Sequence, residues 1–219
     1  MWDNKEMRKT KSDFQREVTT ALKQSLAPGA VERIRNRVER WRGIPFGLSG
    51  LPGHYSGKMH RRLHMLTNLV APKVHSAVFS TLWNGWCTHR RFQRRHWNTN
   101  RCRFKCSDTA EDSIEHYCRC PTVLRVAKYV FKFSYPTELG LDIWALNSAW
   151  LDDAHNLRSL ALLVYGSYNA FNTFRYSPVS NDHDAYHGIQ QHCKQGTAGH
   201  PASVKHIDSS WTREMSFVL

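Results

Sequence analysis

The chain has 219 residues and a mass of 25.5 kDa, a size that suits one large domain or two small ones. Lysine and arginine number 31 against 18 acidic residues, and the formal net charge of +13 favours a polyanionic partner such as nucleic acid. No apolar run approaches the ~20 residues that cross a bilayer, and the charged N-terminal residues lack the apolar core of a secretory signal. We therefore expect an intracellular protein, nuclear or cytoplasmic, with reduced thiols and no membrane partner.

Two basic amphipathic helices are predicted within residues 1–42. In residues 5–26 apolar side chains recur on one face, lysine and arginine cover the other, and the Ala-Pro-Gly at 27–29 ends the pattern. In residues 31–42 apolar side chains recur at steps of three and four, with five arginines on the rest of the surface. A Gly/Pro-rich connector without helical periodicity follows over 43–57.

Residues 58–176 are predicted to form a helical domain. Helices are expected over 58–70 and 73–86, separated by Pro72, and the second has a broad apolar face that belongs in a core. From residue 177 to 219 the sequence is polar and dotted with histidines, and we predict a disordered tail. The same periodicity predicts further helices over 123–131, 137–151 and 157–171.

A basic segment, defined as residues 89–105, precedes the cysteine-rich part of the chain and contains no acid. Phe92 and Trp97 are interleaved among its basic residues, where each could stack on an unpaired base or lie in the core. This pattern predicts contacts with phosphate groups, and nothing in it specifies a base sequence. The predicted nucleic-acid-binding residues are Arg90, Arg91, Arg94, Arg95, Trp97, Arg101, Arg103 and Lys105.

The stretch from Cys102 to Pro121 contains four cysteines and one histidine. Three residues separate Cys102 from Cys106, a spacing that lets a tight turn direct two thiolates to one point. His116 follows farther along, and Cys120 lies four positions beyond it. Three thiolates and one imidazole would make a closed tetrahedral site, and soft sulfur ligands favour zinc in a structural role.

Cys118 and Cys120 compete for the fourth position of this site. Asp112, with Glu115 three residues later, predicts a helix that begins with Asp112 as its N-cap. Residues four apart share a helix face, so His116 and Cys120 would point together, whereas Cys118 would be turned away by about 200°. We favour Cys120; a Cys118 ligand, disulfides in an oxidising compartment and a reduced cluster without metal are the alternatives.

The sequence EDSIEHYCRCP, preceded by CRFKC and WNGWCTHRRFQ, resembles the C-terminal zinc-binding region of reverse transcriptases from non-long-terminal-repeat retrotransposons. The resemblance covers residues 40–176 and is specific around 83–121. It implies a detached C-terminal piece of a polyprotein, for which the polymerase portion would be a partner. The ligands that it implies are the set favoured by spacing, namely Cys102, Cys106, His116 and Cys120.

The polymerase motifs of that family are absent from this sequence. The family uses a palm aspartate and a Tyr/Phe-x-Asp-Asp turn, and palm and fingers are missing here. The pair of adjacent aspartates in this chain is Asp152 and Asp153, which lacks the Tyr or Phe of that turn and stands at the start of a helical pattern. We predict that they cap a helix, that the chain has no catalytic residues, and that it is not an enzyme.

The expected fold class is mainly α: an irregular helical domain with a small Cys-Cys-His-Cys zinc turn over 102–121 and a disordered C-terminal tail. The predicted function is non-catalytic binding of RNA or DNA through phosphate contacts, with zinc as a structural cofactor. The alternative is a structural remnant or a protein-docking module that binds no nucleic acid. A hydrolase is disfavoured because no nucleophile–base–orienter pattern and no open metal site are visible.

Overall fold

The computed structural model describes residues 55–83, 85–92 and 101–198. Within these ranges the secondary structure is helical, apart from one isolated antiparallel bridge between Arg101 and Glu111, which confirms the mainly α fold class. The predicted helices over 5–26 and 31–42 lie outside the described residues. In the same described part of the chain, no helix combines the length and the apolar character needed to cross a membrane.

The first described helices follow the predicted boundaries closely. Helix α3 (Tyr55–Leu69) takes in the last residues of the predicted connector, and α4 (Pro72–Leu82) begins with its proline at the first helical positions, where the missing N–H costs nothing. Helix α4 ends four residues earlier than predicted. Trp86 therefore lies beyond the helix, fully buried, with its indole N–H donating to Thr81 Oγ1 at 2.9 Å.

The middle of the chain forms short helical elements. The predicted helix over 137–151 is divided by the turn after Trp144, and the predicted helix over 123–131 begins two residues earlier, with Pro121 in its first turn. The elements in chain order are α5 (His89–Phe92), α6 (Ile114–Tyr117), α7 (Pro121–Val130), η1 (Thr137–Leu139), α8 (Gly140–Trp144) and η2 (Ala149–Asp152).

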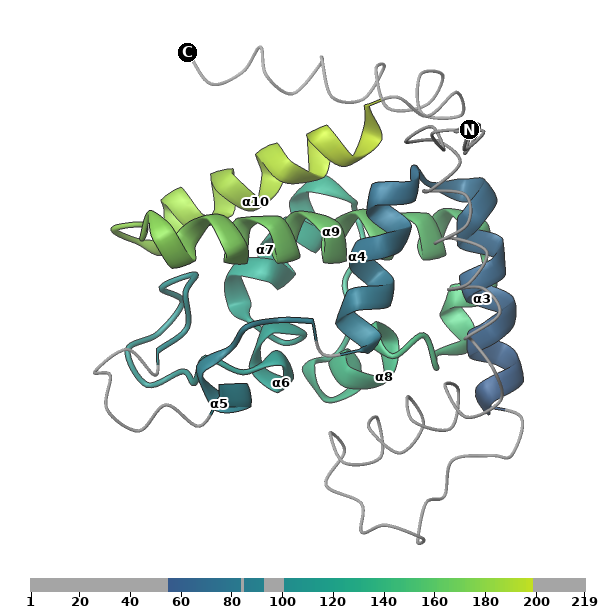
Figure 1. Ribbon diagram of the computed structural model, residues 1–219, viewed down its shortest axis with the longest axis horizontal. Coiled ribbons are helices and arrows are strands. Elements are labelled where there is room, and N and C mark those ends of the chain that lie inside the picture. The colour runs from purple at the N-terminus through teal and green to yellow at the C-terminus, as the bar shows by residue number, and fades with distance from the viewer. Residues whose placement is uncertain (1–54, 84, 93–100, 199–219) are drawn as a thin grey trace, which may run out of the picture.

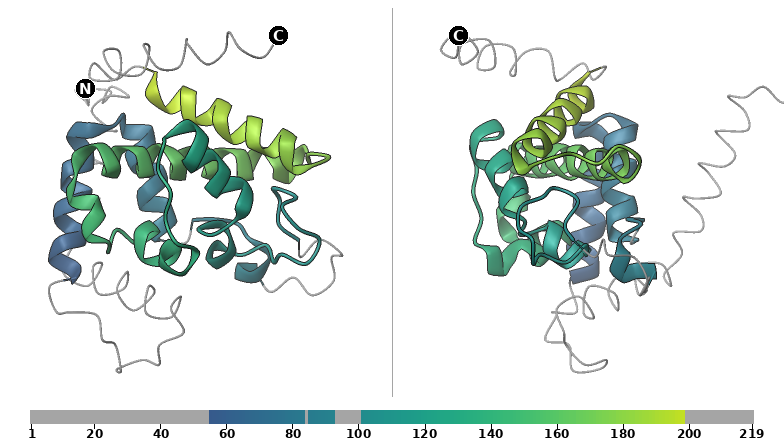
Figure 2. Two further views of the ribbon diagram at one scale, coloured as in Figure 1. Left: turned by 180° about the vertical axis from the view of Figure 1, so that it is seen from behind. Right: turned by 90° about the vertical axis from the view of Figure 1, so that its left-hand side faces the viewer.

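Helix α9 (Ala154–Tyr176) is the central element of the fold. It runs across the molecule, with α3 and α4 packed toward one end and α10 lying along it (Figure 1), and Figure 2 shows α7 on the far side. Asp153 is its N-cap and accepts a hydrogen bond from the Asn156 N–H at 2.9 Å, which confirms the predicted cap at this residue. Asp152 has a different role, described below.

The prediction of disorder from residue 177 onward is wrong for residues 182–197, which form α10 (Asp182–Thr197). Asn181 caps the helix by accepting a hydrogen bond from the Asp184 N–H at 2.9 Å. The helix packs along α9 so closely that a Cβ at Gly166 would overlap the Sγ of Cys193. Its buried stripe consists mostly of small residues, which gives little hydrophobic signal: Ala185, Ile189, Cys193 and Gly196. Residues 199–219 lie outside the described residues.

A cluster of buried aromatic rings joins α9 to the residues around the cysteines. The Trp86 ring lies 5.1 Å from Tyr117 and 5.1 Å from Phe171 of α9, measured between ring centroids. Phe104 packs 4.9 Å from Tyr117 and 6.2 Å from Phe174. The cysteine-rich stretch is therefore part of the main hydrophobic core.

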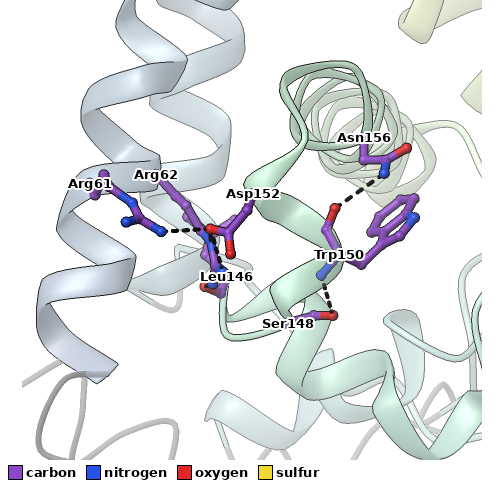
Figure 3. A network of polar contacts seen from close by, with 7 residues as sticks. All are labelled: Arg61, Arg62, Leu146, Ser148, Trp150, Asp152 and Asn156. Carbon is purple, nitrogen blue, oxygen red and sulfur yellow. Dashed lines mark hydrogen bonds and ion pairs between the residues drawn. The ribbon is translucent and has the colours of Figure 1, made fainter.

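A buried arginine fixes the connection before α9 to α3 (Figure 3). Arg62 is fully buried and donates through NH1 to the Leu146 carbonyl at 2.6 Å. Its Nε and NH2 donate to Asp152 Oδ1 at 3.2 and 2.9 Å, and the exposed Arg61 donates to the same oxygen at 2.7 Å. Asp152 is thus the acceptor of an arginine pair, and the predicted helix cap resides in Asp153 alone.

Candidate metal centre

The structure brings the four predicted ligands together. The ligand atoms of Cys102, Cys106, His116 and Cys120 all lie within 4.8 Å of one another. The Sγ atoms of Cys102 and Cys120 are 3.9 Å apart, and the Sγ of Cys106 is 3.2 Å from Nε2 of His116. Three sulfurs and one imidazole nitrogen at these separations could hold a metal ion at their centre.

A tight turn places the first two cysteines. The Cys102 N–H donates to the Ala110 carbonyl at 2.8 Å, next to the Arg101–Glu111 bridge, so the two limbs of the loop are tied together. The Lys105 N–H then donates to the Cys102 carbonyl at 3.1 Å, and Lys105 itself takes a φ of 53°. This left-handed residue reverses the chain and returns Cys106 to the side of Cys102.

The second pair of ligands is placed differently from the prediction. Helix α6 is only four residues long, and its N-cap is Ser113, whose hydroxyl accepts a hydrogen bond from the His116 N–H at 3.2 Å. The prediction of Asp112 as N-cap is therefore wrong. Cys120 is not on the helix of His116; it occupies the N-cap position of α7. Cys120 does lie within the group, but a break between two helices, and not the predicted shared helix face, brings it there.

Cys118 lies outside the ligand group. Its thiol donates to the Glu115 carbonyl at 3.3 Å, and its own carbonyl accepts a hydrogen bond from the Tyr135 hydroxyl at 2.8 Å. A Cβ on Gly140 would come within 2.6 Å of the same carbonyl, so a glycine is needed where α8 begins. Burial raises the pKa of Cys118 to about 12, which keeps this side chain a neutral thiol.

The ligands share protons unequally when no ion is bound. Hydrogen bonds from the thiols of Cys102 and Cys120, together with His116, hold the pKa of Cys106 well below its ordinary value. The hydrogen bond to Cys106 raises the pKa of Cys102, while burial raises the pKa of Cys120 to about 12. An ion that binds all three as thiolates must therefore displace protons from Cys102 and Cys120.

A buried carboxylate links the metal centre to both ends of the basic segment. Asp112 is fully buried, and its carboxylate accepts hydrogen bonds from the Tyr117 hydroxyl at 2.6 Å and from the His89 N–H at 2.9 Å. Arg103 Nε lies 3.6 Å from the same carboxylate, and the Arg103 N–H donates to the Tyr117 hydroxyl at 3.1 Å. We call Asp112 and Tyr117 the clasp. Because Tyr117 follows His116 directly, the clasp fixes residues 89 and 103 relative to the metal ligands.

The predicted nucleic-acid-binding residues fall into three groups. Arg94, Arg95 and Trp97 lie outside the described residues. Arg91 and Lys105 have exposed side chains. The remaining arginines lie near acids that follow the segment in sequence, and these pairs are Arg90–Glu111 at 3.2 Å, Arg101–Asp108 at 3.4 Å and Arg103–Asp112 at 3.6 Å.

A second basic surface was missed by the sequence analysis. On α7, Arg125, Lys128 and Tyr129 share one face, and the Tyr129 ring is 55% exposed with the Lys128 Nζ 5.4 Å from its centroid. The Arg125 guanidinium lies 5.0 Å from the centroid of the Tyr186 ring on α10. We call these four residues the α7 basic face. Tyr186 is the member of this face that lies on α10, within the predicted disordered tail, and Arg125 also forms an ion pair with Asp182 of α10 at 3.1 Å.

Comparison with models of protein families, with curated proteins and with solved structures finds no match to this chain. The resemblance to the C-terminal region of retrotransposon reverse transcriptases thus stays a prediction that rests on the motif residues.

Proposed function

We propose that the ion of this centre is zinc and that its role is structural. Zinc–thiolate bonds of about 2.3 Å in a tetrahedron place neighbouring sulfurs roughly 3.8 Å apart. The Cys102–Cys120 sulfur separation of 3.9 Å fits that edge and carries the proposal. The protein supplies all four ligands and leaves no position for a substrate or a reactive water, so the site suits stabilisation and not catalysis.

We further propose that the zinc-stabilised region binds RNA or DNA without catalysing a reaction, as a protein similar to the C-terminal region of a reverse transcriptase. The net charge of +13 supports a polyanionic partner. The clasp supports it too, because it holds the described ends of the basic segment in a fixed position beside the metal centre. Arg91 and Lys105 are exposed residues of this segment and could contact phosphate groups, although NH1 of Arg91 also donates to the Trp86 carbonyl at 3.4 Å.

One observation favours the alternative of a docking or remnant module. Arg90 and Arg101 already form ion pairs with Glu111 and Asp108, so part of their charge is neutralised within the chain. Exposed pairs of this kind are weak, worth about 1 kcal/mol or less, and a phosphate could replace either acid. The pairs therefore lower the expected affinity without removing the site.

The metal proposal is tested by elemental analysis of the purified protein and of two variants. We expect one zinc per chain in the unchanged protein and in Cys118→Ser, and its loss in Cys120→Ser. The two changes are chemically identical and lie two residues apart, so Cys118→Ser is a matched control. Retention of zinc by both variants, or its loss from both, would contradict the assigned ligand set.

The nucleic-acid proposal is tested by measuring affinity for generic single strands and duplexes across a range of salt concentrations. Each phosphate contact should contribute about 0.9 to the logarithmic slope on a duplex and about 0.7 on a single strand. Replacing Arg91 and Lys105 together by glutamine should flatten the slope by the equivalent of up to two contacts. Lys58→Gln on α3, which lies at the other end of the molecule from α5 and α6 (Figure 1), is the control. Absent or salt-independent binding would favour the docking module.

A further inference from the structure

Two exposed histidines on α10 face each other outside the metal centre. His183 and His187 are one helical turn apart, and their Nε2 atoms are 3.1 Å from each other. The rings are 4.4 Å apart between centroids, with their planes inclined at 71°. We propose that this pair, called the α10 histidine pair, is a second metal site for a divalent transition ion such as Ni²⁺ or Cu²⁺.

The separation of the two nitrogens matches a chelate. Each neutral imidazole presents one nitrogen lone pair, and imidazole is a good ligand for these ions. With metal–nitrogen bonds of about 2.0–2.1 Å, two nitrogens 3.1 Å apart subtend an angle of roughly 100° at the ion. That angle suits adjacent ligands in tetragonal or tetrahedral coordination, with water in the other positions.

The helix holds the pair in this arrangement before an ion arrives. Ala185 and Ile189 are fully buried against the core and fix the opposite face of α10. The Tyr186 ring meets the His187 ring edge to face at 5.2 Å, which restricts one of the two ligands. Because little order has to be created on binding, the cost in conformational entropy is small.

The chain also contains a matched comparison. His60 and His64 on α3 have the same spacing of four residues and are also exposed. The sequence therefore contains two histidine pairs with this spacing. We select the pair on α10 as the metal site because its ring nitrogens lie in contact. His192, the next histidine along α10, is directed elsewhere and lies 2.9 Å from the Gln195 side chain and 3.3 Å from Thr173.

The test is a calorimetric titration of the full-length, zinc-loaded protein with Ni²⁺. We expect one equivalent to bind with an affinity at least tenfold higher than in His187→Gln. The double variant His60→Gln, His64→Gln should bind like the unchanged protein. The proposal would be overturned if the α10 and α3 variants lost Ni²⁺ affinity equally, or if His187→Gln left the affinity unchanged.

Two further measurements keep the result interpretable. Circular dichroism of His187→Gln at 222 nm should match that of the unchanged protein, and His183→Gln provides an independent variant if it does not. Paramagnetic Ni²⁺ should broaden the imidazole resonances of His183 and His187 first, while the zinc content stays constant. Release of zinc, with thiolate-to-nickel absorption and no broadening of these resonances, would place the ion at the cysteines and refute the α10 site.

Discussion

The residues around the metal centre and the pair α9–α10 are held together in different ways. In the first region, residues 101–120, regular structure is limited to the four-residue α6, and the region contains the four candidate ligands and the clasp. In the second, helices of 23 and 16 residues pack along each other through apolar and small side chains. The first region combines the specific hydrogen bonds of the clasp with buried aromatic contacts, whereas packing along two long helices maintains the second.

The two regions meet at the aromatic cluster. Phe104 and Tyr117, which belong to the metal region, lie against Phe171 and Phe174 of α9. A change in either region is therefore transmitted through rings that absorb in the near ultraviolet. The difference between the regions can be tested by removing, one at a time, the interactions that stabilise each of them.

Removal of the ion should have the largest effect. Structural zinc contributes about 10–16 kcal/mol of apparent binding free energy in small modules, so a strong chelator should unfold residues 101–120 locally. We expect loss of the near-ultraviolet circular dichroism of Tyr117 and Trp86, while helicity at 222 nm falls much less because α9 and α10 contain none of the four cysteine and histidine ligands of this centre. An unchanged near-ultraviolet spectrum after complete removal of metal would mean that the clasp alone maintains the region.

The contact between α9 and α10 should be next in magnitude. Gly166→Ala would gain about 1 kcal/mol of helix propensity if there were room, yet its Cβ would overlap the Sγ of the buried Cys193. We expect a net loss of about 2–3 kcal/mol in the free energy of unfolding, measured with urea.

Two variants control for this interpretation. Adding Cys193→Ala should recover part of the loss in Gly166→Ala, since the double variant removes the overlapping sulfur. Gly57→Ala on α3, where a Cβ would meet nothing within 4 Å, should not destabilise the protein. If the effects of the Gly166 and Cys193 changes on the unfolding free energy simply add, the contact between these residues is not the cause of the lost stability.

The same contrast explains what the sequence could predict. Helix α9 was predicted because large apolar residues such as Leu157, Leu160 and Phe171 recur along it at helical spacing. Helix α10 was not, because Ile189 is the one large aliphatic residue in its buried stripe and close approach to Gly166 replaces bulk. Periodicity of hydrophobic side chains detects cores built from large residues and misses those built from close backbone contact.

In the candidate site, ligand spacing was informative and charge was not. The structure brings together the four residues selected by spacing, Cys102, Cys106, His116 and Cys120, although His116 and Cys120 do not share the helix face that the spacing predicts. Arg90 is paired with Glu111, which the bridge to Arg101 holds beside the segment, and Arg101 is paired with Asp108. Spacing alone does not reveal these ion pairs. The pattern of Asp112 and Glu115 resembled a capping box, but Ser113 caps α6 and Asp112 is buried with other partners.

Replacement of the buried carboxylate of the clasp should have the next largest effect. Asp112→Asn keeps the shape of the side chain but turns an N–H₂ group toward either the His89 N–H or the Tyr117 hydroxyl, so one donor loses its acceptor. We expect a loss of about 2 kcal/mol in unfolding free energy with zinc retained. Asp108→Asn, whose side chain is 93% exposed, should change stability very little. If both variants behave alike, the clasp does not position the basic segment.

The clasp should also affect the dependence of stability on pH. Burial raises the pKa of Asp112 above its ordinary value, so the folded protein binds this proton more tightly than the unfolded chain. The contribution of this group to stability is therefore greatest below the ordinary aspartate pKa and decreases as the pH rises through the raised value. Denaturant titrations in acid, with the same zinc concentration for both proteins, should show that the unfolding free energy of the unchanged protein decreases with pH in this range. The decrease should be smaller in Asp112→Asn.

The smallest expected effect concerns the arginine pair on α3, which offers a matched comparison within one helix (Figure 3). Arg62→Met removes the buried hydrogen bond to the Leu146 carbonyl and should lower the unfolding free energy by about 1–2 kcal/mol. Arg61→Met removes an exposed contact with the same Asp152 oxygen and should have an effect within about 0.5 kcal/mol. The two hydrogen bonds from Arg62, more than the one from Arg61, lower the pKa of Asp152. The part of the stability that comes from this pKa shift should therefore disappear as the pH falls through the lowered pKa. Equal effects of the two substitutions would show that charge at Asp152, and not the buried bond to Leu146, connects α3 to the start of α9.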